Sequence, residues 1–229
     1  MTGKFPAADV DPIEDLHKIL RHFRKREMIR IAYRDILGIA DLAETIAELS
    51  AFADACIDQT LTVLYDWQCH ADGIPLGREG TPQQLVVLGL GKLGGREPNY
   101  HSDLDVVFVY EAEGNTQPLS SGRNSTQTTS NQHFFSELAQ RIIKQVNRIG
   151  PLGRLYELDA RLRPTGKSGM LAVSFNTFRR YFAAGDGELW ERQVLCKARP
   201  IYGSKAATEH AMQIVAEAAF GPPWKPANA

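Results

Sequence analysis

The chain has 229 residues, of which 43% are hydrophobic, and a formal net charge of −1. This is enough apolar content for a substantial core, while the near-neutral charge gives no electrostatic reason to expect nucleic acid or an anionic membrane as a partner. No apolar run approaches a membrane span, the N-terminus lacks a signal-peptide pattern, and Cys56, Cys69 and Cys196 are far apart, so we expect reduced thiols in a cytoplasmic protein.

Residues 1–80 are expected to form an N-terminal helical segment. After a loose leader at Pro6–Pro12, apolar residues at helical spacing predict a helix over 13–37. Asp41 followed by Glu44 has the form of a capping box and predicts a second helix that runs to about Cys69. The segment from His70 to Pro82 is rich in turn residues and is interpreted as a linker.

The first helix carries a cluster of basic residues. A solvated helix face explains the cluster, and contact with an acidic partner or a phosphate is the alternative. The residues are Arg21, Arg24, Lys25, Arg26 and Arg30.

The stretch from Leu85 to Tyr110 opens the predicted core, which we place at 81–205. A buried strand over 85–88 is followed by a turn containing four glycines, which tolerate close backbone approach, and then by a second apolar strand over 106–110. Asp103 and Asp105 precede this strand with a spacing of two, so their carboxylates project to the same side. Two adjacent carboxylates repel each other, and a hard cation such as Mg²⁺ relieves that repulsion.

Three other interpretations of this stretch compete with a metal–triphosphate site. The segment from Gly89 to Gly94 matches the G-x-G-x-x-G dinucleotide fingerprint, but the residues up to Ser102 leave no room for the helix that this fingerprint must open. A P-loop would need its lysine after the last glycine, and Lys92 comes earlier. A plain hairpin with Asp103 capping its turn also remains compatible with the pattern.

Farther along, the polar segment from Glu113 to Gln132 predicts a surface loop, and 131–146 predicts a helix. Two shorter helices are expected over 176–183 and 188–197. Residues 206–229 are expected to form a C-terminal helix, over 206–219, and a frayed tail.

Residues 155–163 alternate between apolar and charged side chains, which predicts a half-buried strand. Asp159, Arg161 and Arg163 fall on its charged face. They are compatible with a surface ladder, or with a third metal carboxylate and two arginines that clamp a triphosphate.

Three blocks, GLGKLGGREPNYHSDLDVVFVY, LYELDARLRPTGKSGML and LWERQVLCKARPIYG, resemble the glutamine synthetase adenylyltransferase family. The resemblance implies an α+β protein with the polymerase-β-like nucleotidyltransferase fold, in which an N-terminal helical pair and flanking helices surround a mixed sheet. It also implies that Asp103, Asp105 and Asp159 bind Mg²⁺, or alternatively Mn²⁺, and are catalytic. For ATP binding it leads us to expect phosphate contacts from backbone and hydroxyl groups of Gly94, Gly95 and Ser102, and cationic clamps from Lys92, Arg161 and Arg163.

The implied reaction is metal-dependent transfer of AMP from ATP to a tyrosine of glutamine synthetase, which regulates nitrogen assimilation. A PII-type signalling protein is expected to dock mainly through family regions outside this chain. The reverse, phosphorolytic removal of AMP remains an alternative, although the D-A-R-L-R-P block favours the attaching domain. A non-catalytic module that binds glutamine synthetase or PII is the second alternative.

Overall fold

A computed structural model describes residues 12–119, 128–164 and 166–222. The expected leader up to residue 11, the middle of the polar loop at 120–127 and the expected tail from residue 223 lie outside the described residues.

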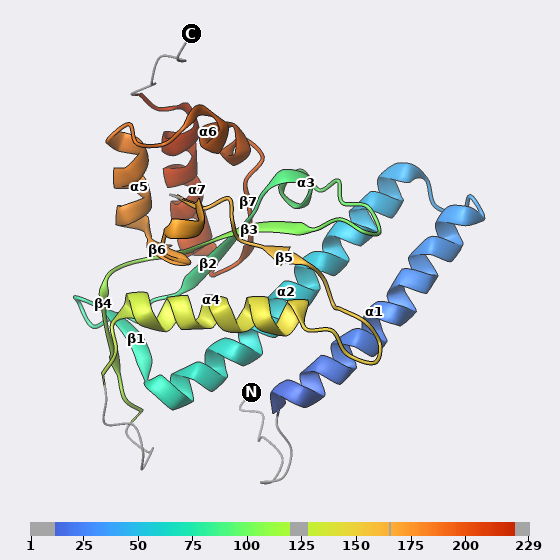
Figure 1. Ribbon diagram of the computed structural model, residues 1–229, viewed down its shortest axis with the longest axis horizontal. Coiled ribbons are helices and arrows are strands. Elements are labelled where there is room, and N and C mark those ends of the chain that lie inside the picture. Colours follow the sequence, from blue (N-terminus) through green and yellow to red (C-terminus); the bar gives the residue numbers. More distant parts are fainter. Residues whose placement is uncertain (1–11, 120–127, 165, 223–229) are drawn as a thin grey trace.

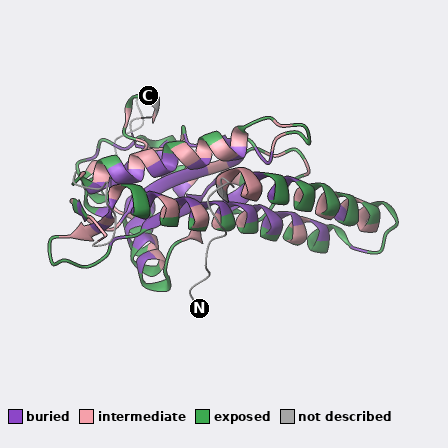
Figure 2. Ribbon diagram, turned by 90° about the horizontal axis from the view of Figure 1, so that it is seen from below, coloured by how far each residue is buried: buried purple, intermediate pink, exposed green. Residues whose placement is uncertain are grey.

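The two predicted N-terminal helices are confirmed as α1 (Pro12–Ile36) and α2 (Leu42–Asp72), and they lie side by side as a hairpin (Figure 1). The side chain of Asp41 accepts a hydrogen bond from the Glu44 N–H at 2.8 Å, which caps the start of α2. Figure 2 shows the closed end of the hairpin projecting beyond the rest of the molecule, with many exposed residues along it. None of the described helices is both long enough and apolar enough to cross a membrane.

A five-stranded mixed sheet lies at the centre of the molecule. β2 and β3 are antiparallel, β7 pairs with the other edge of β2, and β5 and β6 pair in parallel with successive parts of β3. The strands are β2 (Leu85–Gly89), β3 (Leu104–Tyr110), β5 (Leu158–Asp159), β6 (Ala172–Ser174) and β7 (Arg199–Tyr202). This confirms the expected α+β class with a mixed sheet.

Helices cover both faces of this sheet, because successive residues of β2 and β3 point to opposite sides. Leu85 and Val87 pack with α2 and α4 (Asn131–Asn147), whereas Val86 and Leu88 pack with the C-terminal helices. Figure 1 shows this division, with α5, α6 and α7 gathered on one side of the sheet. These three helices are α5 (Phe175–Ala183), α6 (Leu189–Leu195) and α7 (Lys205–Phe220).

The prediction of a linker over 70–82 is wrong in part, because this segment contains a strand, β1 (Ile74–Gly77). β1 pairs with β4 (Gly114–Gln117) in a separate two-stranded sheet. Part of the expected polar loop is therefore regular structure. The local sequence gives little strand signal here, and β1 contains Pro75, which disfavours a strand. The two strands form because they pair with each other across a long stretch of sequence.

The strand predicted over 155–163 is much shorter in the structure, where β5 contains only Leu158 and Asp159. The Oδ1 atom of Asp159 accepts a hydrogen bond from the Arg161 N–H at 2.9 Å, which turns the backbone away from the sheet. The apolar side of the pattern is still buried at Tyr156, Leu158 and Ala160.

Candidate active site

The glycine turn forms a single helical turn, α3 (Gly91–Gly94), between β2 and β3. Gly91 has a φ of +52°, and a Cβ atom built on it would lie 2.8 Å from Oδ2 of Asp105. The neighbouring Leu90 N–H donates to the backbone carbonyl of Asp105 at 2.9 Å. The turn therefore lies directly against Asp105, and only glycine fits at position 91.

Replacing Gly91 with alanine should destabilise the chain and displace the Asp105 carboxylate. Gly38 provides the matched control, because its φ is +65° but nothing lies within 4 Å of the point that a Cβ atom would occupy there. Gly38→Ala should show only the backbone penalty of about 1 kcal/mol, whereas Gly91→Ala adds a steric clash. Urea unfolding of both variants measures the difference, and equal losses would show that the contact with Asp105 has no energetic weight.

Asp105 and Asp159 are direct partners in the parallel pairing of β3 with β5. Residues opposite each other in adjacent strands project to the same side of a sheet, with strands about 4.8 Å apart. Asp103 lies two residues before Asp105 and is exposed. The structure thus places the three predicted carboxylates at one edge of the sheet.

The electrostatic state of Asp105 reflects this arrangement. Burial raises the pKa of its carboxyl, and the negative charges of Asp159 and Asp103 raise it further. Arg161 and Lys92 act in the opposite direction, so both cations lie close enough to influence Asp105. Five of the predicted residues therefore belong to one electrostatic cluster.

Asp159 is held by Arg161 in this conformation. The Arg161 Nε donates to Oδ2 of Asp159 at 2.6 Å, and this contact raises the pKa of the guanidinium. Arg161 was predicted to bind phosphate, but here it serves as the counter-ion of the third carboxylate. Arg161 could bind a phosphate only by giving up its contact with Asp159.

A hard divalent cation fits the chemistry of this edge, because the donors are carboxylate oxygens, and burial together with their mutual repulsion raises the pKa of Asp105. Among the residues that the structure describes, no group of three or more His, Cys, Asp or Glu side chains has the arrangement of a metal centre. In this conformation the carboxylate of Asp159 is paired with the guanidinium of Arg161. The predicted metal site stays a proposal.

Three residues that were predicted to bind phosphate form hydrogen bonds with nearby backbone groups in this structure. The N–H groups of Gly94 and Gly95 donate to Leu90 and Gly91 carbonyls within the turn. A methyl group at Gly94 would also collide with the carbonyl of Lys197, so this glycine allows close packing. The Ser102 hydroxyl accepts from the Asn99 N–H at 2.9 Å and shapes the approach to Asp103.

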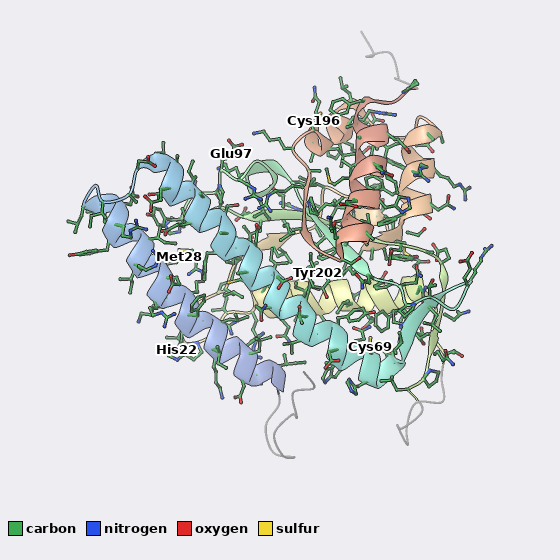
Figure 3. The ribbon with its side chains drawn as sticks, turned by 180° about the vertical axis from the view of Figure 1, so that it is seen from behind. His22, Met28, Cys69, Glu97, Cys196 and Tyr202 are labelled. Atoms are coloured by element: carbon green, nitrogen blue, oxygen red, sulfur yellow. The ribbon has the colours of Figure 1, made fainter. Side chains whose placement is uncertain are left out.

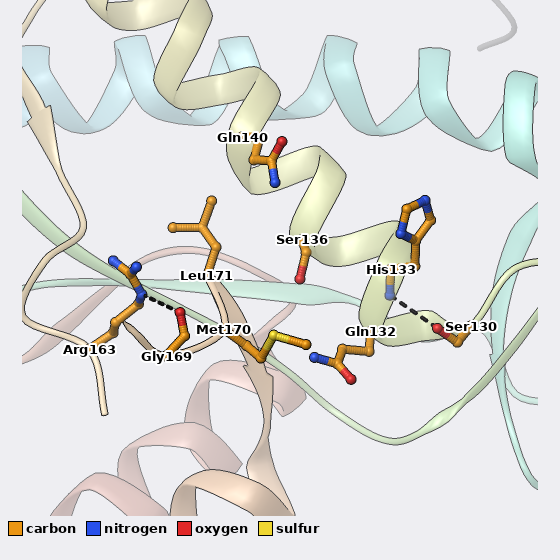
Figure 4. A pocket seen from close by; sticks show the side chains of 9 residues that line it. All are labelled: Ser130, Gln132, His133, Ser136, Gln140, Arg163, Gly169, Met170 and Leu171. Atoms are coloured by element: carbon orange, nitrogen blue, oxygen red, sulfur yellow. Dashed lines mark hydrogen bonds between the residues drawn. The ribbon is translucent and has the colours of Figure 1, made fainter. Parts of the chain in front are cut away.

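Burial lowers the pKa of the Arg163 guanidinium, and the charge of Asp159 acts in the opposite direction, so Arg163 also lies near the acidic cluster. Its Nη1 donates to the Ala160 carbonyl at 2.6 Å and its Nε to the Gly169 carbonyl at 3.3 Å. It lines a cavity of about 600 Å³ beside the N-terminal half of α4, opposite Gln140 and Ser136 (Figure 4). These contacts tie Arg163 to the segment after Asp159, and its predicted role as a phosphate clamp stays a prediction.

The sequence analysis missed Asn147, at the end of α4. Its amide Nδ2 donates to the Leu158 carbonyl at 3.2 Å, and its Oδ1 accepts from the Leu158 N–H at 2.7 Å. These bonds hold β5 and therefore position Asp159. A polar residue at a helix end is common, so no sequence signal distinguishes this one.

Arg199 and Lys197 hold the glycine turn from the other side. Arg199 forms a bidentate pair with Asp54 at 2.7 and 2.8 Å and donates to the Leu93 carbonyl at 3.2 Å. Lys197 pairs with Glu97, just after the turn. Figure 3 labels Glu97 and Cys196, the residue before Lys197 in the chain. Arg199 and Lys197 both belong to the third sequence block, but the sequence pattern alone gave neither of them a role.

The described residues thus form an acidic cluster beside a tight glycine turn, where β3 pairs with β5. Comparison with known proteins then identifies the family: the family model of glutamate-ammonia ligase adenylyltransferase matches residues 6–214, and the chain belongs to this family. This confirms the resemblance carried by the three sequence blocks.

Relatives described as bifunctional glutamine synthetase adenylyltransferase/adenylyl-removing enzymes align over most of the chain. The one from Nitrosococcus oceani is 41% identical over 202 residues, covering 88% of this chain and 20% of the relative. That from Shewanella loihica is 43% identical and covers 82% and 19%, and that from Pseudomonas aeruginosa is 42% identical and covers 86% and 19%. The chain thus spans about a fifth of the length of these relatives.

Proposed function

We propose that this chain is a nucleotidyltransferase domain that transfers AMP from ATP to a tyrosine of glutamine synthetase. The single observation that carries the proposal is the in-register pairing of Asp105 with Asp159 beside Asp103. Family membership supports the choice of reaction, and the mixed sheet with helices on both faces is consistent with a polymerase-β-like fold.

Within this proposal, Asp103, Asp105 and Asp159 hold Mg²⁺, with Mn²⁺ as the alternative. Such cations, when bound, stabilise the attacking and leaving oxygens of an in-line displacement. The residues of the chain contribute position and charge. Gly91 lets the turn lie directly against Asp105, while Asn147 holds the strand that carries Asp159.

The tyrosine hydroxyl attacks the α-phosphorus of ATP, the new O–P bond forms, and the bond to the departing diphosphate breaks. Asp159 accepts the hydroxyl proton, directly or through water. Arg161 and Lys92 offer positive charge to the phosphates, because both already influence Asp105. Arg161 must leave Asp159 to do so, which couples nucleotide binding to release of the third carboxylate.

The direct test incubates the chain with glutamine synthetase and ATP labelled at the α-phosphate. Label should appear on a tyrosine of glutamine synthetase, whereas ATP labelled at the γ-phosphate should leave the protein unlabelled. Label from the γ-phosphate alone would indicate a kinase and overturn the proposal.

The reverse direction is the second candidate, because the relatives are named as both adenylyltransferase and adenylyl-removing enzymes. Incubation with adenylylated glutamine synthetase and inorganic phosphate should release ADP if this chain removes AMP. Failure of both reactions, with retained binding to glutamine synthetase, would support a non-catalytic module.

ATP with Mg²⁺ should raise the melting temperature of the chain, because a ligand that binds only the folded state stabilises it. NAD with Mg²⁺ should leave the melting temperature unchanged. Differential scanning fluorimetry with each nucleotide measures both effects, and stabilisation by NAD alone would restore the dinucleotide interpretation.

A further inference from the structure

A cavity of about 430 Å³ lies between α1 and the loop at 148–157 that follows α4, and we call it the basic pocket. α1 lines it with Arg21, Arg24 and Lys25, whose spacing places them on one face of the helix. The opposite wall includes Arg154. The volume is within the range of small-molecule sites, and none of the lining residues belongs to the acidic cluster.

Arg21 joins the two walls of the basic pocket. Its Nε donates to the Gly153 carbonyl at 2.9 Å, and its Nη2 donates to the Arg148 carbonyl. Only 8% of Arg21 is exposed. Burial and the charge of Arg148 lower the pKa of its guanidinium, while Glu14 acts in the opposite direction. A buried cation therefore holds the loop beside α1, as Figure 1 shows, and the pocket is part of the fold.

The four cations that line the basic pocket have one carboxylate partner. Arg154 pairs with Glu157. Within the described ranges, the ion pairs formed by α1 and by the 148–157 loop involve none of the other three, which are Arg21, Arg24 and Lys25. Four cations less one carboxylate leave three positive charges at the pocket.

The remaining acids between residues 12 and 30 do not reduce this excess, because each has a cation outside the pocket lining as its partner. Glu14 pairs with Arg148, and Asp15 pairs with Lys18. Farther along, the guanidinium groups of Arg26, Arg30 and Arg34 face the carboxylates of Glu27, Glu44 and Glu48. The basic cluster seen in the sequence is thus divided into a neutralised part and a part that lines the pocket.

The rest of the pocket lining is apolar. It consists of Met28, Ile29, Pro151 and Leu152. Ile29 is 60% exposed and Leu152 36%, so an organic group that covers them removes apolar surface from water. Figure 3 labels Met28 on α1. Cations beside an apolar wall favour a ligand that has both an anionic and an apolar part.

We propose that the basic pocket binds a phosphate monoester that carries an apolar organic group. A phosphate monoester has roughly two negative charges at neutral pH, against one for a carboxylate, and therefore suits an excess of three cations better. The phosphate meets the guanidinium of Arg24, which lies 5.1 Å from the centre of the Tyr156 ring, and the exposed ammonium of Lys25. This site is independent of the proposed transfer reaction.

The test uses 1-naphthyl phosphate as the probe and the complete chain in buffer with a metal chelator, so that the acidic cluster has no cation with which to recruit phosphate. Isothermal titration should show one-to-one binding that weakens at high salt. 1-Naphthoate, which has a single charge, and inorganic phosphate, which has no apolar group, should each bind at least about tenfold more weakly.

Lys25→Met should weaken binding of 1-naphthyl phosphate by at least about tenfold, because it removes a charged donor. Lys18→Met is the matched control: Lys18 is an exposed lysine of the same helix outside the pocket lining, and this variant should bind like wild type. Leu152→Ser should weaken binding of 1-naphthyl phosphate and leave that of inorganic phosphate unchanged, since it alters only the apolar wall. Circular dichroism melting checks that all three variants remain folded.

Absence of 1-naphthyl phosphate binding, equal affinity for 1-naphthoate, or equal losses in Lys25→Met and Lys18→Met would overturn the proposal. A loss in Lys92→Met with Lys25→Met unaffected would assign the phosphate to the acidic cluster instead. Vesicles that contain phosphatidic acid distinguish the source of the monoester. Sedimentation of wild type but not of Lys25→Met would identify a lipid headgroup, whereas no sedimentation would identify a free phosphorylated metabolite.

Discussion

Asp105→Asn should abolish adenylyl transfer and, in metal-free buffer at neutral pH, raise the melting temperature of the chain. The loss of a carboxylate that anchors a cation should lower the rate roughly a hundredfold or more. Stability should change in the opposite direction, because burial and the charges of Asp159 and Asp103 disfavour the ionised form of Asp105. Asparagine removes the charge and keeps the shape.

The stabilisation by Asp105→Asn should depend on pH with a defined sign. A raised pKa in the folded state means that Asp105 contributes full stability below the ordinary aspartate pKa of 3.8 and that this stability is lost as pH rises through the folded-state pKa. Wild type and variant should therefore melt alike at the acidic end and separate as pH rises.

Melting curves of both proteins across pH, with a metal chelator, measure this separation. Glu209→Gln serves as the control, because Glu209 is an exposed carboxylate on α7 whose side chain is 64% exposed, and its removal should change little. A variant that melts below wild type at neutral pH, or one that still transfers AMP at the wild-type rate, would refute the assignment of Asp105.

Arg199→Met should have the largest effect on stability among single substitutions around the glycine turn. It removes the bidentate pair with Asp54 and the bond to the Leu93 carbonyl, and it leaves Asp54 without this cation. The two side chains are only 14% and 24% exposed, so the loss should be about 3 kcal/mol of the free energy of unfolding. The Michaelis constant for ATP should also rise, because the turn beside Asp105 loses its support.

Two comparisons separate this effect from the general loss of an arginine. Arg179→Met removes an exposed pair with Glu217 and should lower the free energy of unfolding by less than about 1 kcal/mol. Asp54→Asn combined with Arg199→Met should be more stable than Arg199→Met alone, since it leaves no unpaired carboxylate. Denaturant unfolding measures all of these variants, and equal losses for Arg179→Met and Arg199→Met would contradict the prediction.

The parts of the fold with strong local patterns could be predicted from the sequence. The helices α1, α2 and α4 carry apolar residues at helical spacing, and the two central strands are apolar runs beside a glycine turn. The acidic pair followed from the alternation of side chains in a strand, which needs no tertiary information.

The parts that depend on distant partners could not be predicted in the same way. β1 and β4 pair although β2, α3 and β3 lie between them in the sequence. β5 is held by Asn147, which belongs to the preceding helix α4. Arg163 has the alternating position of a phosphate clamp, yet the short length of β5 sends its guanidinium to the Ala160 and Gly169 carbonyls. A periodic pattern specifies which face a residue occupies only as far as the strand continues.

The two-residue length of β5 has a consequence for the order in which the molecule loses activity on heating or in denaturant. β5 lies at the edge of the sheet, whereas β2 and β3 have strands on both sides in its centre. Amides of the edge segment should exchange with solvent deuterium through local opening, well before the central strands unfold. Catalysis should consequently fail at a lower denaturant concentration than global unfolding, with Asp159 the first of the three carboxylates to leave its place.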